Sequence, residues 1–132
     1  MPWLLDTNVW ISVLKHPGGA LDARVRSQPT HEMLLCSVVK AELWHGAEKY
    51  GNRERRLRAL GRFFDEFVSL PFDDECALHY ADIRHRLESL GTPIGPNDLK
   101  IAAIARAHAL TVVTGNLTEF ERVPGLKVEK WE

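Results

Sequence analysis

The sequence predicts an α/β fold, a three-layer α/β/α sandwich around a mainly parallel central sheet of four to five strands. Short apolar runs alternate along the chain with longer segments whose apolar residues recur at helical spacing. This alternation is typical of parallel strands joined by crossover helices. The length of 132 residues is sufficient to bury a core without disulfide or metal cross-links, so we expect residues 1–132 to form a single domain.

The first half of the chain contains two predicted strands. The first strand is the apolar run Pro2–Leu5, and a helix follows from about Asn8 until the stretch HPGG, His16–Gly19, ends it. A short helix near Leu21–Ser27 leads to the second strand, Glu32–Cys36. Strand and helix therefore alternate from the start of the chain.

Two helices are expected after the second strand. Ser37 has the residue type of a helix N-cap, and its helix should run to Tyr50, where Gly51 stops it. The next helix carries the arginines of NRERRLRALGR, Asn52–Arg62. Its apolar side consists of Leu57, Leu60, Phe63, Phe64 and Phe67. The arginines therefore project outward, either as a solvated helix face or as a contact to RNA or a partner.

The second half of the chain repeats the alternation. After a short strand around Phe67–Leu70, Asp73 and Asp74 begin a long helix that ends at Leu90–Gly91. The stretch GTPIGPN is a loop by its glycine and proline content, and Pro96 suits the first turn of the helix that follows. Two strands close the chain, a buried-looking one at Thr111–Thr114 and a weaker terminal one at Lys127–Glu129.

Composition narrows the function classes. With 17 Lys and Arg against 18 Asp and Glu, the net charge is −1, which gives no support for a nucleic-acid binder driven by bulk basicity. The N-terminal apolar run has no basic flank and breaks at Asp6, unlike a signal peptide, and no run reaches membrane-spanning length. Cys36 and Cys76 lie in apolar contexts and are not spaced as a metal pair. We expect reduced core cysteines and a cytoplasmic protein.

Three acidic residues, far apart in the sequence, are predicted to meet at one edge of the sheet. Asp6 ends the first strand, Glu42 lies in the second turn after the second strand, and Asp98 lies in the first turn of the helix before the fourth strand. These are all positions at the carboxyl edge, where open α/β sheets bind ligands. Asp6 and Asp98 also have a simpler interpretation as helix-capping or first-turn residues. Three carboxylates brought together would repel one another, and a divalent cation such as Mg²⁺ or Mn²⁺ resolves the conflict.

We therefore predict Asp6, Glu42 and Asp98 as catalytic residues, with Asp6 and Asp98 as metal ligands. A cation held there would lower the pKa of a bound water molecule. Glu42 would be a further ligand or would orient that water. Three secondary candidates follow the fourth strand: Thr114, Asn116 and Glu119. Asn116 could orient the water, or it could be a plain turn residue, because Gly-Asn is common in turns.

Four stretches, in order and at fitting spacing, resemble the PIN-domain ribonucleases that act as VapC-type toxins: LLDTNVWI, SVVKAELWHGAEK, GTPIGPNDLKIAAIARAH and TVVTGNLTEFERVPGLKVEKW. The family's acidic residues map onto Asp6, Glu42 and Asp98. Many PIN domains carry a further aspartate where this chain has Asn116, so either Glu119 substitutes for it at a second metal position or one ion suffices until RNA binds.

The resemblance implies a PIN-like fold and an Mg²⁺- or Mn²⁺-dependent endoribonuclease in a bacterial or archaeal cytoplasm. It implies an RNA substrate, with tRNA and specifically the anticodon stem-loop of initiator tRNA as the hypothesis. It also implies a homodimer and a cognate VapB-like antitoxin that occludes the site, within a larger toxin–antitoxin assembly.

Contacts to RNA and partners must come from residues outside the acid set. The arginine helix, Lys100 and Arg106 are candidates for phosphate contacts, which would make affinity depend on salt. Trp10 and Trp44 are expected in the core; otherwise they line a dimer or antitoxin surface.

Three alternatives remain open from the sequence. A PIN-like module that binds RNA but cuts it weakly is favoured by the missing fourth aspartate. An aspartyl-phosphate phosphatase would use Asp6 as its nucleophile, but it usually has a second aspartate two residues later, where this chain has Asn8. A signalling receiver domain would need a phospho-acceptor after the third strand, where SLPFDD offers only helix-capping aspartates.

Overall fold

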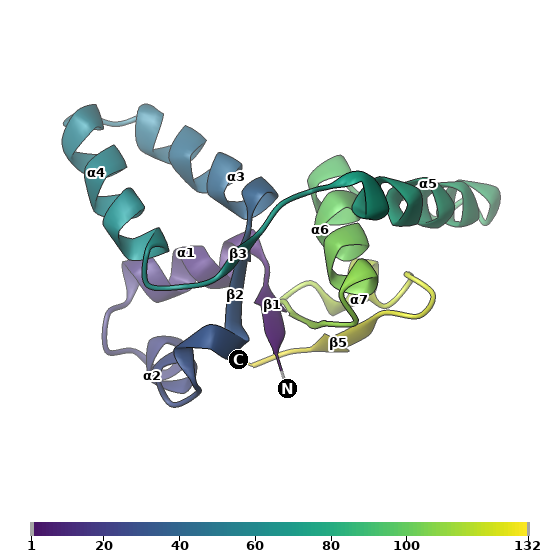
Figure 1. The fold of residues 1–132 in the computed structure, drawn as a ribbon, viewed down its shortest axis with the longest axis horizontal. Helices are drawn as coiled ribbons and strands as arrows, with labels where there is room; N and C mark the ends of the chain where they lie inside the picture. The colour runs from purple at the N-terminus through teal and green to yellow at the C-terminus, as the bar shows by residue number, and fades with distance from the viewer. Residues whose placement is uncertain (1, 132) are drawn as a thin grey trace.

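Five parallel strands form the centre of the computed structural model, which describes residues 2–131 (Figure 1). The strands are β1 (Trp3–Leu5), β2 (Met33–Cys36), β3 (Ser69–Leu70), β4 (Thr111–Val113) and β5 (Lys127–Glu129). Their order is β3-β2-β1-β4-β5, and every neighbouring pair is parallel. The predicted α/β sandwich is confirmed, with five strands in its sheet.

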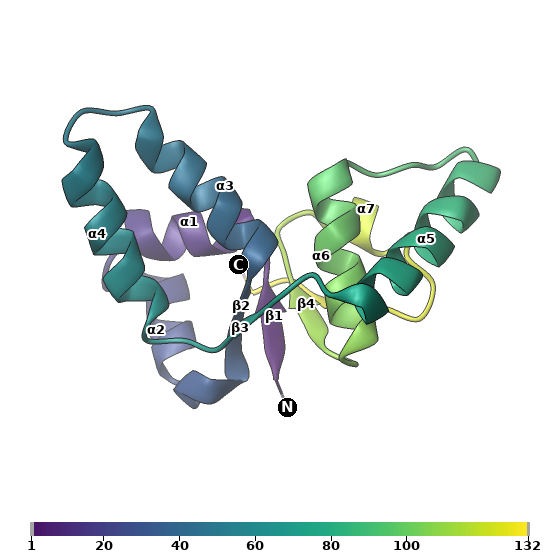
Figure 2. The ribbon, with the colours of Figure 1, turned by 45° about the horizontal axis from the view of Figure 1, so that its top comes forward.

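Helices cover both sides of the sheet. They are α1 (Thr7–Lys15), α2 (Ala20–Arg26), α3 (Ser37–Glu48), α4 (Arg53–Phe64), α5 (Asp74–Ser89), α6 (Pro96–Ala107) and α7 (Leu117–Phe120), with a 3-10 turn η1 (Thr30–Glu32) before β2. Figures 1 and 2 show α1 to α4 on one side of the strands and α5 to α7 on the other. The chain steps outward from β1 to β3 and then returns past β1 to β4. The two directions therefore diverge between β1 and β4, the kind of switch point where α/β sheets bind ligands.

The inner strands are buried on both faces. Every residue of β2 and β4 is buried, which is the continuous apolar pattern that covered parallel strands require. Trp10 of α1 is fully buried between Phe63 and Phe67, with ring centroids 5.7 and 4.8 Å away. Its predicted core position is confirmed. The same prediction is wrong for Trp44, which is 39% exposed because it packs edge-on against Phe64 at the outer side of α3 and α4.

Several local predictions need correction. Ser37 is the first residue of α3 and Cys36 is its N-cap, because β2 runs into the helix without a loop. The Ser37 hydroxyl instead accepts a hydrogen bond from the Phe72 backbone N–H at 3.2 Å. Phe67 lies beyond α4, which ends at Phe64. The four-residue α7 was not predicted, since one helical turn carries no periodicity.

The two cysteines match the prediction of reduced core residues. Cys36 and Cys76 are buried and form no disulfide. Burial raises the pKa of the Cys36 thiol to about 11, so it remains protonated at neutral pH. In residues 2–131, no helix combines the length and apolar character needed to cross a bilayer.

Arg106, one of the candidates for a phosphate contact, instead uses its guanidinium within the protein, where it joins α5 to α6. Its Nε donates to Nδ1 of His79 at 2.8 Å, and its Nη2 pairs with the Asp82 carboxylate at 2.7 Å. Its Nη1 donates to the Pro124 carbonyl at 3.3 Å. The side chain is mostly buried and fully engaged within the protein, so it is a structural tie.

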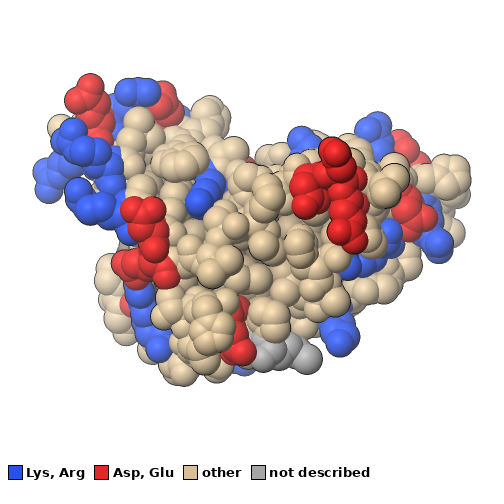
Figure 3. Space-filling model, in the orientation of Figure 1, with Lys and Arg blue, Asp and Glu red and all other residues tan. Residues whose placement is uncertain are grey.

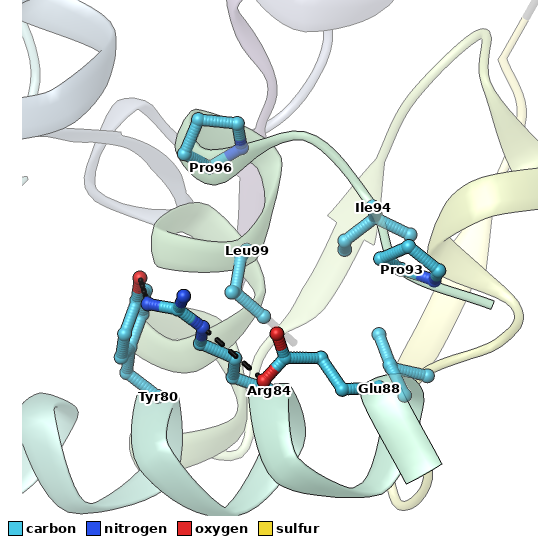
Figure 4. A pocket seen from close by; sticks show the side chains of 8 residues that line it. Tyr80, Arg84, Glu88, Pro93, Ile94, Pro96 and Leu99 are labelled. Carbon is cyan, nitrogen blue, oxygen red and sulfur yellow. Dashed lines mark hydrogen bonds and ion pairs between the residues drawn. The ribbon is translucent and has the colours of Figure 1, made fainter. Parts of the chain in front are cut away.

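A cavity of about 310 Å³ lies between α5 and the loop before α6 (Figure 4). Arg84 lines the cavity from α5, where it donates to the Tyr80 hydroxyl at 3.2 Å and pairs with Glu88 at 3.4 Å. The apolar wall is contributed by Leu87, Pro93, Ile94, Pro96 and Leu99. None of the predicted catalytic acids lines this cavity.

Candidate active site

Asp6 lies directly after β1, at the switch point of the sheet. Its Oδ1 accepts from the Val9 backbone N–H at 3.0 Å, which makes it the N-cap of α1. Its Oδ2 accepts from the Thr114 hydroxyl at 2.5 Å, across from the end of β4. Only 4% of the residue is exposed. The capping interpretation and the sheet-edge interpretation are therefore both correct for this residue.

Thr114 connects Asp6 to the turn after β4. The residue is buried, and its hydroxyl accepts from the Asn116 backbone N–H at 2.9 Å while it donates to Asp6. Asn116 contacts Thr114 only through its backbone N–H, and Asn116 itself is exposed. The structure therefore places Thr114 at the acid set through its side chain and Asn116 beside it through its main chain.

Glu42 is held by a neighbour that the sequence reasoning missed. The Thr7 hydroxyl, in the first turn of α1, donates to Glu42 Oε1 at 2.7 Å. Thr7 directly follows Asp6, so α1 donates hydrogen bonds to two acids, from the Val9 N–H to Asp6 and from the Thr7 hydroxyl to Glu42. A hydroxyl next to a predicted ligand was the only signal for this role, and many such hydroxyls are plain helix-start residues.

Asp98, in the first turn of α6, completes the group together with Glu119 of α7. Its pKa is raised to about 7, first by burial and then by a hydrogen bond and charge repulsion with Glu119. The charges of Asp6 and Glu42 raise it further. The Asp98 carboxyl therefore keeps its proton to a higher pH than an ordinary aspartate does. We call Asp6, Glu42, Asp98 and Glu119 the acid set.

Three of the four acids have no ion pair with a basic side chain in the part of the chain that the structure describes. Among residues 2–131, no lysine or arginine forms an ion pair with Glu42, Asp98 or Glu119. This uncompensated repulsion contributes to the raised pKa of Asp98. Carboxylate and hydroxyl oxygens are the hard donors that divalent cations prefer, so these residues fit a metal ion of that kind.

A second group of ligand-type side chains lies at the opposite end of α6. Asp73, Cys76 and His108 place one ligand atom each within 4.8 Å of one another. Asp73 is already the N-cap of α5, accepting from the Cys76 backbone N–H at 3.0 Å, and this hydrogen bond lowers its pKa. The group mixes oxygen, sulfur and nitrogen, unlike the all-oxygen acid set.

Two hollows meet at Glu42. One, of about 450 Å³, lies between α1, α3 and α4, and it has an apolar wall that includes Ile11, Leu14 and Leu43. The other, of about 560 Å³, lies between α3, the loop before α5 and the start of α6. Lys and Arg side chains gather over α4 at the upper left of Figure 3, whereas acidic ones gather over the start of α5. The prediction that the arginines of α4 project outward is confirmed.

Comparison with known proteins gives a consistent result along the whole chain. Residues 3–126 match the PIN domain. The chain is 38% identical over 131 residues to the tRNA(fMet)-specific endonuclease VapC of Salmonella typhimurium, covering 99% of this chain and 98% of that protein. It is 37% identical to Ribonuclease VapC2 of Haemophilus influenzae, with the same coverage of 99% and 98%.

Solved structures agree. The DNA-bound VapBC of Salmonella typhimurium matches with a TM-score of 0.92 and 38% identity, over 100% of this chain and 99% of that one. VapBC2 of Rickettsia felis, bound to a DNA fragment from the promoter, matches with a TM-score of 0.87 and 33% identity over 100% of both chains.

Proposed function

We propose that this chain, which belongs to the PIN-domain family, is a metal-dependent endoribonuclease of the VapC type that hydrolyses phosphodiester bonds in RNA. The observation that carries the proposal is the acid set at the switch point, where three acids from distant parts of the chain act together on the Asp98 pKa. Relatives named ribonuclease and tRNA(fMet)-specific endonuclease support RNA, and tRNA first, as the substrate. Family membership removes the support for the phosphatase and receiver alternatives.

In this proposal Asp6 and Asp98 hold Mg²⁺ or Mn²⁺, with Glu119 in place of the aspartate that many PIN domains carry. When bound, the ion supplies positive charge to a phosphate oxygen and makes a water molecule more acidic. The Val9 N–H and the Thr114 hydroxyl fix the Asp6 carboxylate before binding, as outer contacts commonly do for ligands. Glu42, oriented by Thr7, takes the proton of the attacking water. Asp98 must lose its proton for the ligand set to form.

We also propose that a VapB-like antitoxin inhibits this chain. The similar solved structures are VapBC complexes, which supports a partner of that kind. The hollow between α1, α3 and α4 is the surface that best suits an apolar helix or extended segment of a partner, because its wall is largely apolar. Glu42 also lies in this wall, so a partner bound there would contact the acid set directly. The homodimer stays a prediction, which the molar mass from light scattering tests.

The decisive experiment is RNA cleavage by the purified chain. A total tRNA pool, incubated with Mg²⁺ or Mn²⁺, should yield discrete fragments whose ends map the cut position. EDTA should abolish the products, and Asp98→Asn should do the same, whereas Asp74→Asn on the exposed start of α5 should cut normally. Cleavage that survives complete chelation contradicts the proposal. RNA binding without products under Mn²⁺ would favour the non-cutting RNA-binding module instead.

A further inference from the structure

The open hollow of about 560 Å³ beside the acid set has a mixed wall. Its lining side chains are Ser37, Val38, Ala41, Glu42, His45, Phe72, Asn97 and Lys100. Glu42 belongs both to this wall and to the acid set, while Asn97 and Lys100 flank Asp98 along α6. A molecule in the hollow therefore lies against the residues proposed to cut RNA.

Phe72 offers the hollow a fixed aromatic ring. Its backbone N–H donates to the Ser37 hydroxyl at 3.2 Å, which ties the loop before α5 to the start of α3. Its ring packs edge-on against Tyr80, with centroids 5.9 Å apart. The residue is half-buried and lines the hollow with its remaining surface. Proteins recognise unpaired RNA bases by stacking them on such rings.

Asn97 and Lys100 supply the polar contacts that a nucleotide needs. They are three residues apart on α6 and so share one face of the helix. Within residues 2–131, neither side chain makes a hydrogen bond or an ion pair. The Asn97 amide can both donate to and accept from a base edge. The Lys100 ammonium can bind a phosphate near the acid set, where the carboxylates would otherwise repel RNA.

We propose that this hollow binds one nucleotide of the RNA adjacent to the scissile phosphate, with its base on Phe72, the base edge at Asn97 and a phosphate at Lys100. The inference rests on the proposed nuclease function, which it deepens. The volume lies within the ordinary range of ligand sites. Five of the eight lining side chains are polar, which suits a nucleotide better than an apolar peptide. The apolar hollow on the other side of Glu42 is left for a protein partner.

The test uses variants of the hollow and matched controls outside it. Phe72→Leu keeps apolar packing but removes the flat ring, whereas Phe72→Trp keeps a ring. Lys100→Gln removes the charge. The controls are Leu78→Ala and Lys127→Gln, both at exposed positions outside the hollow. Binding of a fluorescein-labelled single-stranded oligoribonucleotide is measured by anisotropy in an Asp6→Asn background, and cleavage of tRNA with Mn²⁺ is measured in the wild-type background.

Phe72→Leu and Lys100→Gln should each weaken RNA binding about tenfold, the size typical of one stacked base or one lost phosphate contact. Phe72→Trp and both controls should bind as the parent does. Lys100→Gln should also lower the salt dependence of binding by about one phosphate contact. Thermal unfolding of every variant confirms that the fold is retained.

The outcomes separate this inference from the function on which it rests. If the wild type cuts tRNA and both hollow variants bind and cut equally well, the nucleotide site is wrong and the nuclease stands. If the oligoribonucleotide binds through Phe72 and Lys100 but Mn²⁺ gives no products, the site is supported and the proposed cleavage is overturned. If the variants lose antitoxin binding while RNA affinity is unchanged, the hollow is a protein site and the inference fails.

Discussion

Replacing Asp98 by asparagine should stabilise the metal-free protein above neutral pH while abolishing RNA cleavage. The carboxyl has a pKa of about 7 in the fold, against 3.8 in the unfolded chain, because burial, Glu119, Asp6 and Glu42 all disfavour its charge. A difference of that size corresponds to about 4 kcal/mol for a fully buried group. Because Asp98 is only half-buried, solvent screening reduces this to about 2 kcal/mol. Asparagine keeps the shape and removes the charge.

The sign of the pH dependence follows from the direction of the shift. Between pH 3.8 and about 7 the folded state binds the extra proton, so raising the pH through this window lowers the wild-type free energy of unfolding. Above pH 7 the wild type carries the full penalty, and Asp98→Asn does not. Urea unfolding in EDTA at pH 5 and pH 8 measures both proteins. The asparagine variant should gain stability over the wild type at pH 8 more than at pH 5.

A bound metal ion should reverse the order of stability of the wild type and Asp98→Asn. Mn²⁺ should stabilise the wild type, because it binds the folded acid set, and should have a smaller effect on Asp98→Asn. Two results would refute the reasoning: a variant that is less stable than the wild type at pH 8 without metal, or a variant that cuts RNA at the wild-type rate.

Three further predictions concern neighbours of the acid set and the core. Thr114→Val removes the hydroxyl that donates to Asp6 and should cost about 1–3 kcal/mol of stability together with most of the cleavage, while Thr114→Ser should retain both, measured by urea unfolding and fragment yield. Arg106→Gln should destabilise the fold by about 1–3 kcal/mol and leave RNA affinity unchanged, because its guanidinium is engaged by α5 and the Pro124 carbonyl; a loss of affinity without a loss of stability would restore it as a phosphate contact. Trp10→Ala should cost about 3–5 kcal/mol and Trp44→Ala about 1 kcal/mol in the same unfolding assay, since only the first ring is fully buried, and equal losses would contradict this.

The fold was predictable because its inner strands β1, β2 and β4 are short, mainly apolar runs separated by amphipathic segments. Each run was located to within one or two residues, since parallel strands covered on both faces must be apolar throughout. The N-cap of α3 was predicted one residue too late, because strand β2 continues directly into the helix and Cys36 takes the cap position. The Ser37 hydroxyl instead accepts a hydrogen bond from Phe72, 35 residues later in the chain. That partner is fixed by tertiary structure, which a local capping rule does not contain.

The acid set was predictable for a different reason. The alternation of parallel strands and crossover helices places strand ends and the starts of the following helices at one edge, so Asp6 and the start of α6 were expected at the same edge without knowledge of the strand order. Topology does not predict which side chains from distant parts of the chain form hydrogen bonds or ion pairs with each other. Arg106 pairs with residues 24 and 27 positions earlier on α5, and nothing in the α6 periodicity distinguishes such an arginine from an exposed one. Thr7 and Glu42 are likewise 35 residues apart.

The same hydrogen bonds that hold the acids also explain how an acidic edge can exist within a stable fold. Asp6 is buried but accepts from a helix N-terminus and a threonine, so its charge is compensated before any ion or substrate arrives. Among residues 2–131, no backbone N–H or hydroxyl donates to Asp98 in this way, and burial together with its acidic neighbours raises its pKa. The pKa of Asp98 is raised, so a cation entering the set competes with the proton on that carboxyl. Cation affinity should then rise with pH through the Asp98 pKa, because the competing proton is lost over the same range.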